Sequence, residues 1–509
     1  MEPADRRYGS LVRATPRSLV LVTVDCLRAD HVGFLGYSGE TTPFLDSLAE
    51  ESFVFHSAIA SGVPTYYSLP ALFASRHPLA LGRDVIGIAP DENTLATELK
   101  GCGRETAAFV AANPYISRAC GYDRGFDTFC DFLKPDTAGL APHLEHDPSA
   151  ALRTRTNQLL SKLCHSVPVL RQAYDEIYFQ YCQRRTNSPG ESLDDLRRFP
   201  SADVVVDRAI AWLDEHSSQP FFLWLHLMDP HAPYYPQLRA VQQIGLHNLD
   251  TAQAKRLNAY WYRSDLGPDR LQKKQKAIVA LYDAGIRWAD LQIKRLAQKL
   301  QSLNVWNQCV VALTSDHGEE FLEHGGRFHS PNSLYEELVH VPLLFRVPGY
   351  SARRDARMPI GLIDLAPTLL SVLEISVPAS FTGRSSWRQL INGQSWDRPV
   401  ITECVHGCNN PLYPDRRLGA RLMSVRQRNF KLVINFASGM EELFDLRSDP
   451  NERNPLPFGT AVEQRRSLLE CARQHIAQAP QCRDTDLRFG ARVRDLRIRW
   501  ERSTASKVN

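Results

Sequence analysis

The stretch SLVLVTVD, residues 18 to 25, is a run of apolar and β-branched side chains that stops at a carboxylate. Two further runs have the same form, PFFLWLHLMDPH (220 to 231) and QCVVALTSDHGE (308 to 319). Continuous apolar runs of this length suit strands that are buried on both faces of a sheet. We therefore expect three buried strands, each followed at once by polar residues.

A helical pattern lies between the second and third of these runs. In the segment from 276 to 301, Ala289, Ile293, Leu296 and Leu300 recur at spacings of four, three and four, which places them on one helix face. Alternating strands and helices predict an α/β fold with a largely parallel central sheet flanked by helices. The ligand crevice of such sheets lies beyond the carboxyl ends of the strands, where five polar side chains fall: Asp25, Asp229, His231, Asp316 and His317.

The length of 509 residues exceeds what one compact core usually holds. We expect a large domain over residues 15–385, a smaller C-terminal α+β domain over 396–490 and a tail over 491–509. The segment 131–199 interrupts the alternation with helical patches and scattered basic residues. It is predicted to be an insertion, either a lid over the site or a peripheral helical subdomain.

Composition and charge exclude several classes of protein. The net charge of +3 comes from 60 basic and 57 acidic residues, a balance that argues against nucleic-acid binding. The N-terminal apolar run is too short for a signal peptide, and no stretch approaches the ~20 apolar residues of a membrane span, so we expect a cytoplasmic protein without a transmembrane segment. The 11 cysteines lack paired metal-type spacing and fit reduced thiols.

The loop TSDHGEEFLEHGGRFHS, 314 to 330, concentrates groups that can carry chemistry. Adjacent Asp316 and His317 at a strand end can share one cation, and oxygen with imidazole ligands suits a borderline transition metal. An exposed polar loop is the simpler alternative. Further along the same loop stand Glu319, His324, Arg327 and His329.

Thr65 and His231 can each be interpreted either as a functional residue or as a structural one. In SGVPTYYSLPALFASRHP, 61 to 78, Thr65 stands where a loop enters a helix, and taken alone it is most simply an N-cap. In MDPHAPYYP, His231 follows a predicted strand and could serve as an acid, although a lone His there is more often a hydrogen-bonding structural residue.

Motifs from about residue 18 to 455 carry a family resemblance over most of the chain. They include VTVDCLRADHVGFLGY, LPALFASRHP, NPYISRACGYDRGFDTF, WLHLMDPHAPY, TSDHGEEFLEHGG, LIDLAPTLLSVL and ELFDLRSDPNERN. In this order they resemble the sulfatase family within the alkaline phosphatase superfamily. The resemblance implies an alkaline-phosphatase-like sheet and a divalent cation bound by Asp25 and Asp316.

The resemblance also bears on the nucleophile. In the family it is commonly a Cys converted to formylglycine within a CxPxR pattern. Here Thr65 stands at the position of that Cys and Leu69 at that of its Arg, and no Cys occurs from residue 27 to 101. We therefore expect no formylglycine. Similar enzymes, the phosphoethanolamine and phosphoglycerol transferases and the nucleotide pyrophosphatases, use a metal-bound Thr, which implies that role for Thr65.

By the same resemblance, the cation is one divalent metal held by Asp25, Thr65, Asp316 and His317. Cys26 replaces a second Asp of many sulfatases, and the imidazole of His317 favours Zn²⁺ or Mn²⁺ over Ca²⁺ or Mg²⁺. The other site residues implied are His231 and His329 as catalytic groups and His324 and Arg327 as substrate-binding groups.

We expect a metal-dependent hydrolase that cleaves sulfuric or related phosphoric esters. The substrate would be an anionic ester of a small molecule, glycan or lipid. One alternative is a phosphodiesterase or phosphotransferase that resembles the phosphoethanolamine and phosphoglycerol transferases. Another is a non-catalytic binding protein that keeps the fold. The sequence indicates no oligomeric state.

Overall fold

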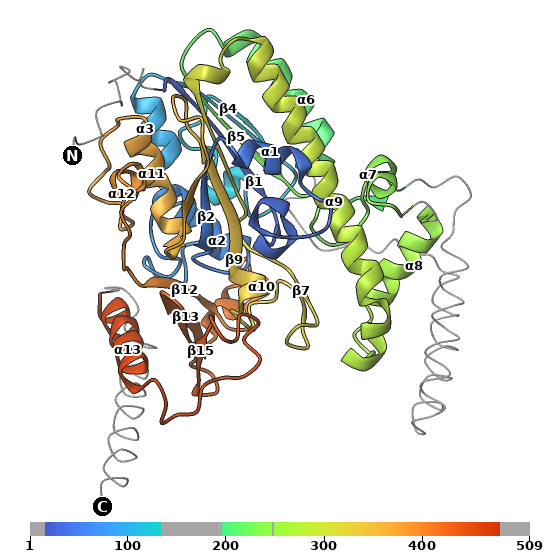
Figure 1. Cartoon of the computed structure of the whole chain (residues 1–509), viewed down its shortest axis with the longest axis vertical. Coiled ribbons are helices and arrows are strands. Elements are labelled where there is room, and N and C mark those ends of the chain that lie inside the picture. The colour runs from blue at the N-terminus through green and yellow to red at the C-terminus, as the bar shows by residue number, and fades with distance from the viewer. Residues whose placement is uncertain (1–15, 134–192, 194–195, 247–248, 479–509) are drawn as a thin grey trace, which may run out of the picture.

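The computed structural model describes residues 16–133, 193, 196–246 and 249–478. A nine-stranded sheet runs through the larger part of the molecule in the order β10-β2-β9-β6-β1-β5-β3-β4, with β11 beside β2 (Figure 1). Its strands are β1 (Ser18–Val24), β2 (Phe53–Ile59), β3 (Glu105–Val110), β4 (Thr128–Cys130), β5 (Phe221–Leu227), β6 (Cys309–Thr314), β9 (His340–Arg346), β10 (Arg354–Ala356) and β11 (Ile360–Gly361).

The sheet is mixed but mostly parallel, which confirms the predicted fold class. Strand β1 pairs in parallel with β5 on one side and β6 on the other. Strand β9 alone runs antiparallel to its neighbours, β2 and β6, among the described strands. The three apolar runs form β1, β5 and β6 side by side, so their carboxyl ends meet at one edge of the sheet.

Alternation along β1 divides the core into two layers. Val20 and Val22 face one side of the sheet, and Leu19 and Leu21 face the other. The first side is covered by α1 (Pro43–Ala49), α6 (Ala202–His216), α8 (Thr251–Trp261) and α9 (Pro268–Ser302). The second is covered by α2 (Thr65–Ala74), α3 (Leu95–Gly101), α11 (Leu365–Val372) and α12 (Trp387–Ile391).

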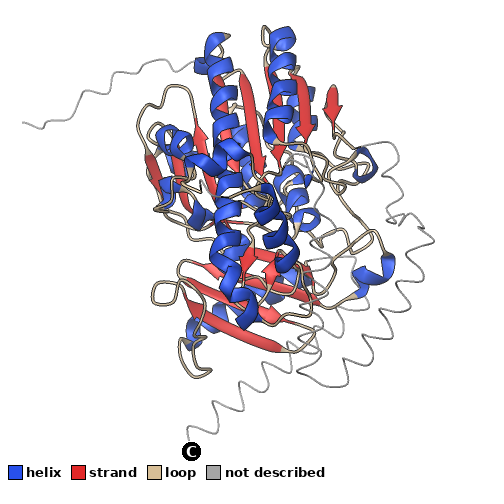
Figure 2. Ribbon diagram, turned by 90° about the vertical axis from the view of Figure 1, so that its right-hand side faces the viewer, coloured by secondary structure: helices blue, strands red, loops and turns tan. Residues whose placement is uncertain are grey.

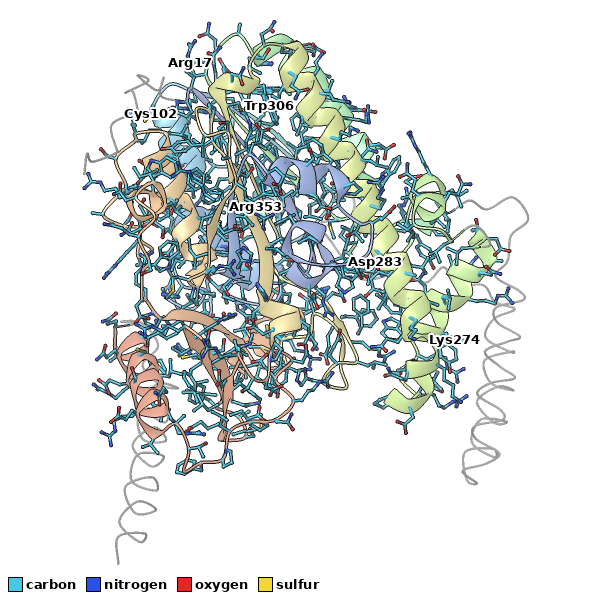
Figure 3. The ribbon with its side chains drawn as sticks, viewed as in Figure 1. Arg17, Cys102, Lys274, Asp283, Trp306 and Arg353 are labelled. Carbon is cyan, nitrogen blue, oxygen red and sulfur yellow. The ribbon has the colours of Figure 1, made fainter. Side chains whose placement is uncertain are left out.

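The long helix α9 contains the predicted helical segment, and its four predicted core residues are all buried. It also holds the loop after β1. Asp283, labelled in Figure 3, accepts hydrogen bonds from His31 Nδ1 (2.7 Å) and from the Tyr37 hydroxyl (2.6 Å). One residue earlier, the Tyr282 hydroxyl donates to the carbonyl of Cys26 (2.7 Å). These contacts fix the chain immediately beyond the end of β1.

A second, smaller sheet follows in the chain and lies below the first in the view of Figure 2. It is antiparallel, in the order β12 (Val400–Val405), β13 (Arg421–Gln427), β14 (Phe430–Asn435) and β15 (Met440–Asp445). Helix α13 (Val462–Ala477) packs on β13 and β14 through Leu468, Ala472 and Ile476. This arrangement confirms the smaller C-terminal α+β part.

The remaining elements are short: α7 (Leu238–Gln243), α10 (Glu336–Val339), β7 (Glu320–Phe321) and β8 (Arg327–Phe328). Most of the predicted insertion, 131–199, and the whole of the predicted tail, 491–509, lie outside the described residues. Within the part of the chain that is described, no helix combines the length and the apolar character needed to cross a membrane.

Candidate active site

Asp25 follows the last residue of β1 and is fully buried. Two donors from neighbouring elements bind the same carboxylate oxygen, Oδ2: Asn113 Nδ2 at 3.1 Å and His226 Nε2 at 3.2 Å. The carboxylate can only accept, so His226 carries its proton on Nε2. These two bonds fix the carboxylate and leave its other oxygen, Oδ1, facing the centre of the site.

The environment keeps Asp25 ionised. Burial alone would raise the pKa of this carboxyl group. The hydrogen bond from His226 and the positive potential of the neighbouring His231 oppose the effect of burial, and the pKa of Asp25 lies well below its usual range. A buried anion is thus present at the end of β1.

His317 presents one ring nitrogen to this anion. Its Nδ1 lies 2.9 Å from the carbonyl oxygen of Gly318, which can only accept, so Nδ1 carries the proton and Nε2 bears a lone pair. That Nε2 lies 3.4 Å from Asp316 Oδ2 and 3.8 Å from Asp25 Oδ1. A lone pair therefore faces two carboxylate oxygens inside a buried site.

Thr65 completes the group, and its N-cap interpretation is wrong. Pro64 occupies the N-cap position of α2, and Thr65 is the first helical residue with no capping hydrogen bond. Its hydroxyl instead lies 3.1 Å from His317 Nε2 and donates to it. The side chain is buried, at 4% exposure. The loop after β2 thus brings a hydroxyl to the ends of β1 and β6.

This donor set fits a divalent cation. Asp316 Oδ2 is buried and has no hydrogen-bond donor among the described residues. A buried carboxylate oxygen without a donor is costly, and a cation placed between it and the neighbouring Asp25 Oδ1 and His317 Nε2 would remove that cost. Asp25, Thr65, Asp316 and His317 therefore suit the metal role that the sequence predicted for them, and that role stays a prediction.

A second group of side chains adjoins the first. Cys26 donates from Sγ to Asp25 Oδ1 (3.1 Å) and lies 3.4 Å from His329 Nδ1. Its backbone has a positive φ of 61°, which is uncommon for a residue with a side chain and directs the thiol into the site. His329 also contacts Glu319 Oε2 at 3.2 Å, and its ring centroid lies 4.9 Å from that of His231.

His231 and His329 each keep one ring nitrogen available. Nδ1 of His231 donates to the carbonyl of Ala232, and Nδ1 of His329 faces the carboxylate of Glu319. The Nε2 atoms are therefore the ones that can exchange a proton with a substrate. Both rings are partly exposed, whereas Asp25 and His317 are fully buried. The two histidines thus stand on the solvent side of the group.

The structure places His324 and Arg327 in other contacts. His324 Nδ1 bonds Glu337 (2.6 Å) and Nε2 donates to the carbonyl of Glu452 (3.0 Å). Arg327 donates to the carbonyl of Trp261 and lies over that residue's ring. No described contact joins either residue to Thr65, so their substrate-binding role stays a prediction.

Two residues of the site were missed from the sequence, Asn113 and His226. His226 sits inside β5, in register with Thr23 of β1, and its Nδ1 lies 2.8 Å from the Thr23 hydroxyl. A polar residue inside an otherwise apolar strand was a signal for it. Asn113 follows β3 and gave no such signal.

The sheet, with its anionic cluster beyond the parallel strand ends, defines an alkaline-phosphatase-like fold. The chain belongs to the sulfatase family, because residues 17–375 match it. Residues 323–475 also match the C-terminal region of N-sulphoglucosamine sulphohydrolase.

Similar proteins agree with this assignment. Arylsulfatase K of Bos taurus is 29% identical over 287 residues, which are 48% of this chain and 50% of that protein. A "Sulfatase" of Formosa agariphila is 24% identical and covers 57% of this chain and 59% of its own. The chain thus spans about half the length of the curated relatives it matches first.

Two solved structures share the fold. One was determined in complex with D-glucosamine-2-N,6-O-disulfate; it has a TM-score of 0.65 and 16% identity, and covers 92% of this chain and 99% of its own. The other is a phosphonate monoester hydrolase of Agrobacterium radiobacter, with a TM-score of 0.60 and 19% identity, covering 92% and 96%. At these identities they support the fold alone.

Proposed function

We propose that the protein is a metal-dependent sulfuric ester hydrolase in which Thr65 replaces formylglycine as the nucleophile. The observation that carries the proposal is the Thr65 hydroxyl at the first turn of α2, 3.1 Å from His317 Nε2 and beside the buried carboxylates of Asp25 and Asp316. The arylsulfatase relatives support sulfate as the group that is cleaved.

A bound divalent cation would lower the pKa of the Thr65 hydroxyl and neutralise charge on the substrate. The residues around this cation would have different roles. Asn113 and His226 hold Asp25 so that one oxygen faces the cation. Asp25, Asp316 and His317 would hold the cation beside Thr65.

The reaction proceeds in two displacements. The Thr65 hydroxyl would lose its proton to solvent when a bound cation lowers its pKa, and Oγ1 attacks sulfur. The bond from sulfur to the alcohol oxygen breaks, and His231 or His329 donates a proton from Nε2 to the departing alcohol. Water then attacks sulfur and breaks the bond to Thr65. The products are sulfate and the regenerated hydroxyl, and the histidine recovers its proton from the attacking water.

Charge determines which ester the site accepts. No hydrogen-bond or ion-pair partner of Thr65, Asp25, Asp316 or His317 in the described chain is a lysine or arginine. One cation balances two carboxylates, which leaves little positive charge for a substrate with nearly two negative charges. Monoanions, namely sulfate monoesters and phosphodiesters, should therefore react faster than phosphomonoesters.

The test is an activity panel of aryl sulfates, phosphodiesters and phosphomonoesters, each assayed with Zn²⁺, Mn²⁺, Mg²⁺ and Ca²⁺. We expect aryl sulfates to be turned over fastest and phosphomonoesters slowest. Phosphodiester turnover above sulfate turnover would favour the phosphodiesterase alternative. If the protein takes up no stoichiometric cation and turns over none of the three classes, the enzyme proposal fails and a binding protein remains.

A further inference from the structure

Three metal-binding side chains converge where the larger part of the chain meets its C-terminal helix. His77 lies in the loop after α2, Glu403 on β12 and His475 on α13. His475 Nε2 is 3.1 Å from Glu403 Oε2, and the two imidazole centroids are 4.3 Å apart. One ligand atom from each residue lies within 4.8 Å of the other two. Segments far apart in the sequence thus form one group.

Glu403 is held in a fixed orientation as an anion. Its Oε1 accepts the backbone N–H of Leu79 at 3.1 Å, and its Oε2 lies 3.2 Å from Arg421 Nη1. Carboxylate ligands of metals are commonly fixed by such neighbouring groups.

His77 has the form that binds metals. Its Nδ1 is buried and has no hydrogen-bond partner among the described residues. A buried ring nitrogen without a partner carries a desolvation cost, which a ligand at that position would remove.

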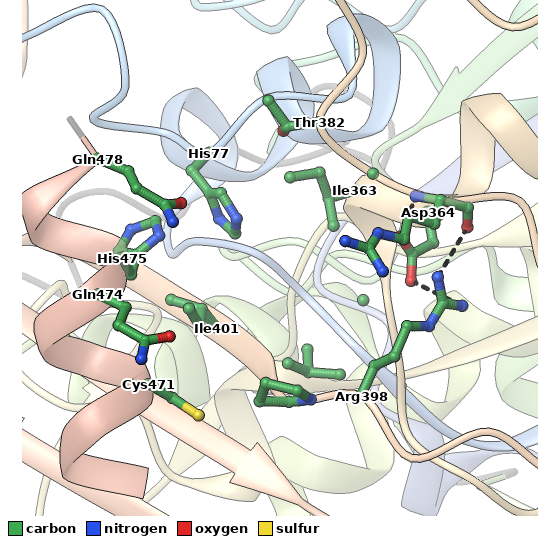
Figure 4. A pocket seen from close by; sticks show the side chains of 15 residues that line it. His77, Ile363, Asp364, Thr382, Arg398, Ile401, Cys471, Gln474, His475 and Gln478 are labelled. Carbon is green, nitrogen blue, oxygen red and sulfur yellow. Dashed lines mark hydrogen bonds and ion pairs between the residues drawn. The ribbon is translucent and has the colours of Figure 1, made fainter. Parts of the chain in front are cut away.

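Open space adjoins the two histidines. A cavity of about 340 Å³ lies between α13 and the segment around Asp364, and both histidines line it. Figure 4 shows His77 and His475 on one side and Asp364 and Arg398 on the other. The cavity has room for water molecules that would complete a coordination shell.

We propose that His77, Glu403 and His475 bind a divalent transition-metal cation, with Zn²⁺ the best match to this donor set. Two imidazoles and one carboxylate are common zinc ligands, and three protein ligands leave a fourth position for water from the cavity. The bound cation would join α13 to β12 and to the loop after α2. The C-terminal helix would thereby be clamped to the larger part of the chain.

This site is separate from the one around Thr65. Helix α2 has 10 residues and is about 15 Å long; Thr65 begins it, and His77 lies beyond its other end. Arg421 shares Glu403 Oε2 with the cation and opposes its charge. We therefore expect zinc to bind here more weakly than at a site of the same ligands without an arginine.

The experiment counts Zn²⁺ bound to the full chain after chelation and reconstitution. The variants are His77→Gln and His475→Gln, since Gln keeps a polar side chain, and the control is Gln474→Ala on the same cavity wall. We expect two equivalents in the wild type and in the control and one in each His variant, with aryl sulfate turnover unchanged. Equal zinc content in the wild type and both His variants would overturn the proposal.

A variant that lacks the two carboxylates of the Thr65 site distinguishes zinc bound here from zinc bound there. In the Asp25→Asn/Asp316→Asn variant, one equivalent should remain, and it should disappear when His475→Gln is added. Hydrogen exchange in α13 should slow with Zn²⁺ in the wild type and not in the His variants. If His475→Gln does not fold, as judged by circular dichroism, His77→Gln decides the outcome, because its ring makes no hydrogen bond to a described residue.

Discussion

The Thr65 hydroxyl and His317 Nε2 are 3.1 Å apart although 252 positions separate the two residues in the sequence. The contact joins the start of α2 to the residues after β6, and β1, which lies beside β6, brings Asp25 to the same edge of the sheet. A threonine that could have been a helix cap is instead part of a buried polar cluster.

Replacing Thr65 tests its role as nucleophile. Thr65→Ala should lower turnover by several orders of magnitude, in line with the loss of a nucleophile in other hydrolases, and should leave the fold nearly unchanged. Thr65→Ser should keep measurable activity. Thr94→Ala is the matched control, because Thr94 is a true N-cap of α3; it should cost about 1 kcal/mol in unfolding free energy and leave turnover intact.

Thr65→Cys addresses formylglycine directly. The neighbouring position that carries Arg in the CxPxR pattern is Leu69 here, so the new cysteine should stay an unmodified thiol and be poorly active, even beside the modifying enzyme. Mass spectrometry of the peptide that contains residue 65 gives the readout. Detection of formylglycine there, or full activity of Thr65→Ala, would remove Thr65 from the mechanism.

Cys26 should influence which metal the site prefers. A sulfur donor beside Asp25 favours Zn²⁺ and Co²⁺ over Ca²⁺ and Mg²⁺. The Co²⁺-loaded protein should show a sulfur-to-cobalt charge-transfer band, and this band should be absent from Cys26→Ser. Cys408→Ser is the control and should keep the band, because Cys408 is buried in a separate hydrophobic cluster. Cys26→Asp should shift the preference toward Mn²⁺ and Ca²⁺. An unchanged spectrum in Cys26→Ser would show that the thiol does not contact the metal.

Asn113 and His226 should act through Asp25. Removal of either donor, by Asn113→Leu or His226→Gln, should weaken metal affinity about 10- to 100-fold, as is typical of groups that orient a metal ligand. Competition with a chromophoric chelator measures the dissociation constant. His216→Gln serves as the control, because its ring bonds the Trp212 carbonyl on α6. Affinities equal to that of the control would contradict the positioning role.

Asp229 should make stability depend on pH. Burial raises the pKa of Asp229 to about 7, well above its unfolded value of 3.8, even though the carboxylate accepts the N–H of Ala202. A raised pKa means that the folded state binds the extra proton, so this contribution is complete below pH 4 and is lost as the pH rises through 7. Each pKa unit corresponds to about 1.4 kcal/mol.

The Asp229→Asn variant should therefore lose less stability than the wild type between pH 5 and pH 8. Urea denaturation at the two pH values gives the unfolding free energies. Asp91→Asn, at an exposed loop position, is the control and should follow the wild type. Parallel curves for the wild type and Asp229→Asn would contradict the assignment.

Local sequence patterns predicted much of the fold, because strands buried on both faces of a sheet consist of continuous apolar runs. SLVLVTV, FFLWLHL and CVVALT became β1, β5 and β6. The reversed direction of β9 could not be predicted, because HVPLLFR has the same apolar character whichever way it runs. Strand direction depends on which neighbours the strand pairs with, and that is decided far away in the sequence.

In the site, too, residues that are close in sequence were predicted together, and contacts between distant segments were missed. Asp316 and His317 are adjacent in the sequence and were found together. His226 was missed because its relation to Asp25 depends on the register of β5 against β1, which no local pattern encodes. His324 stood in the same short loop as His329, yet the turn directs it toward Glu337 and Glu452 instead.

Leu69 has a consequence for how this chain could change over evolutionary time. Its side chain is fully buried among Leu72, Phe73 and the other apolar residues on one face of the central sheet. An arginine there would place an unpaired charge in that layer, at a cost of several kcal/mol. A CxPxR pattern starting at residue 65 would thus require repacking of α2 as well as a new cysteine.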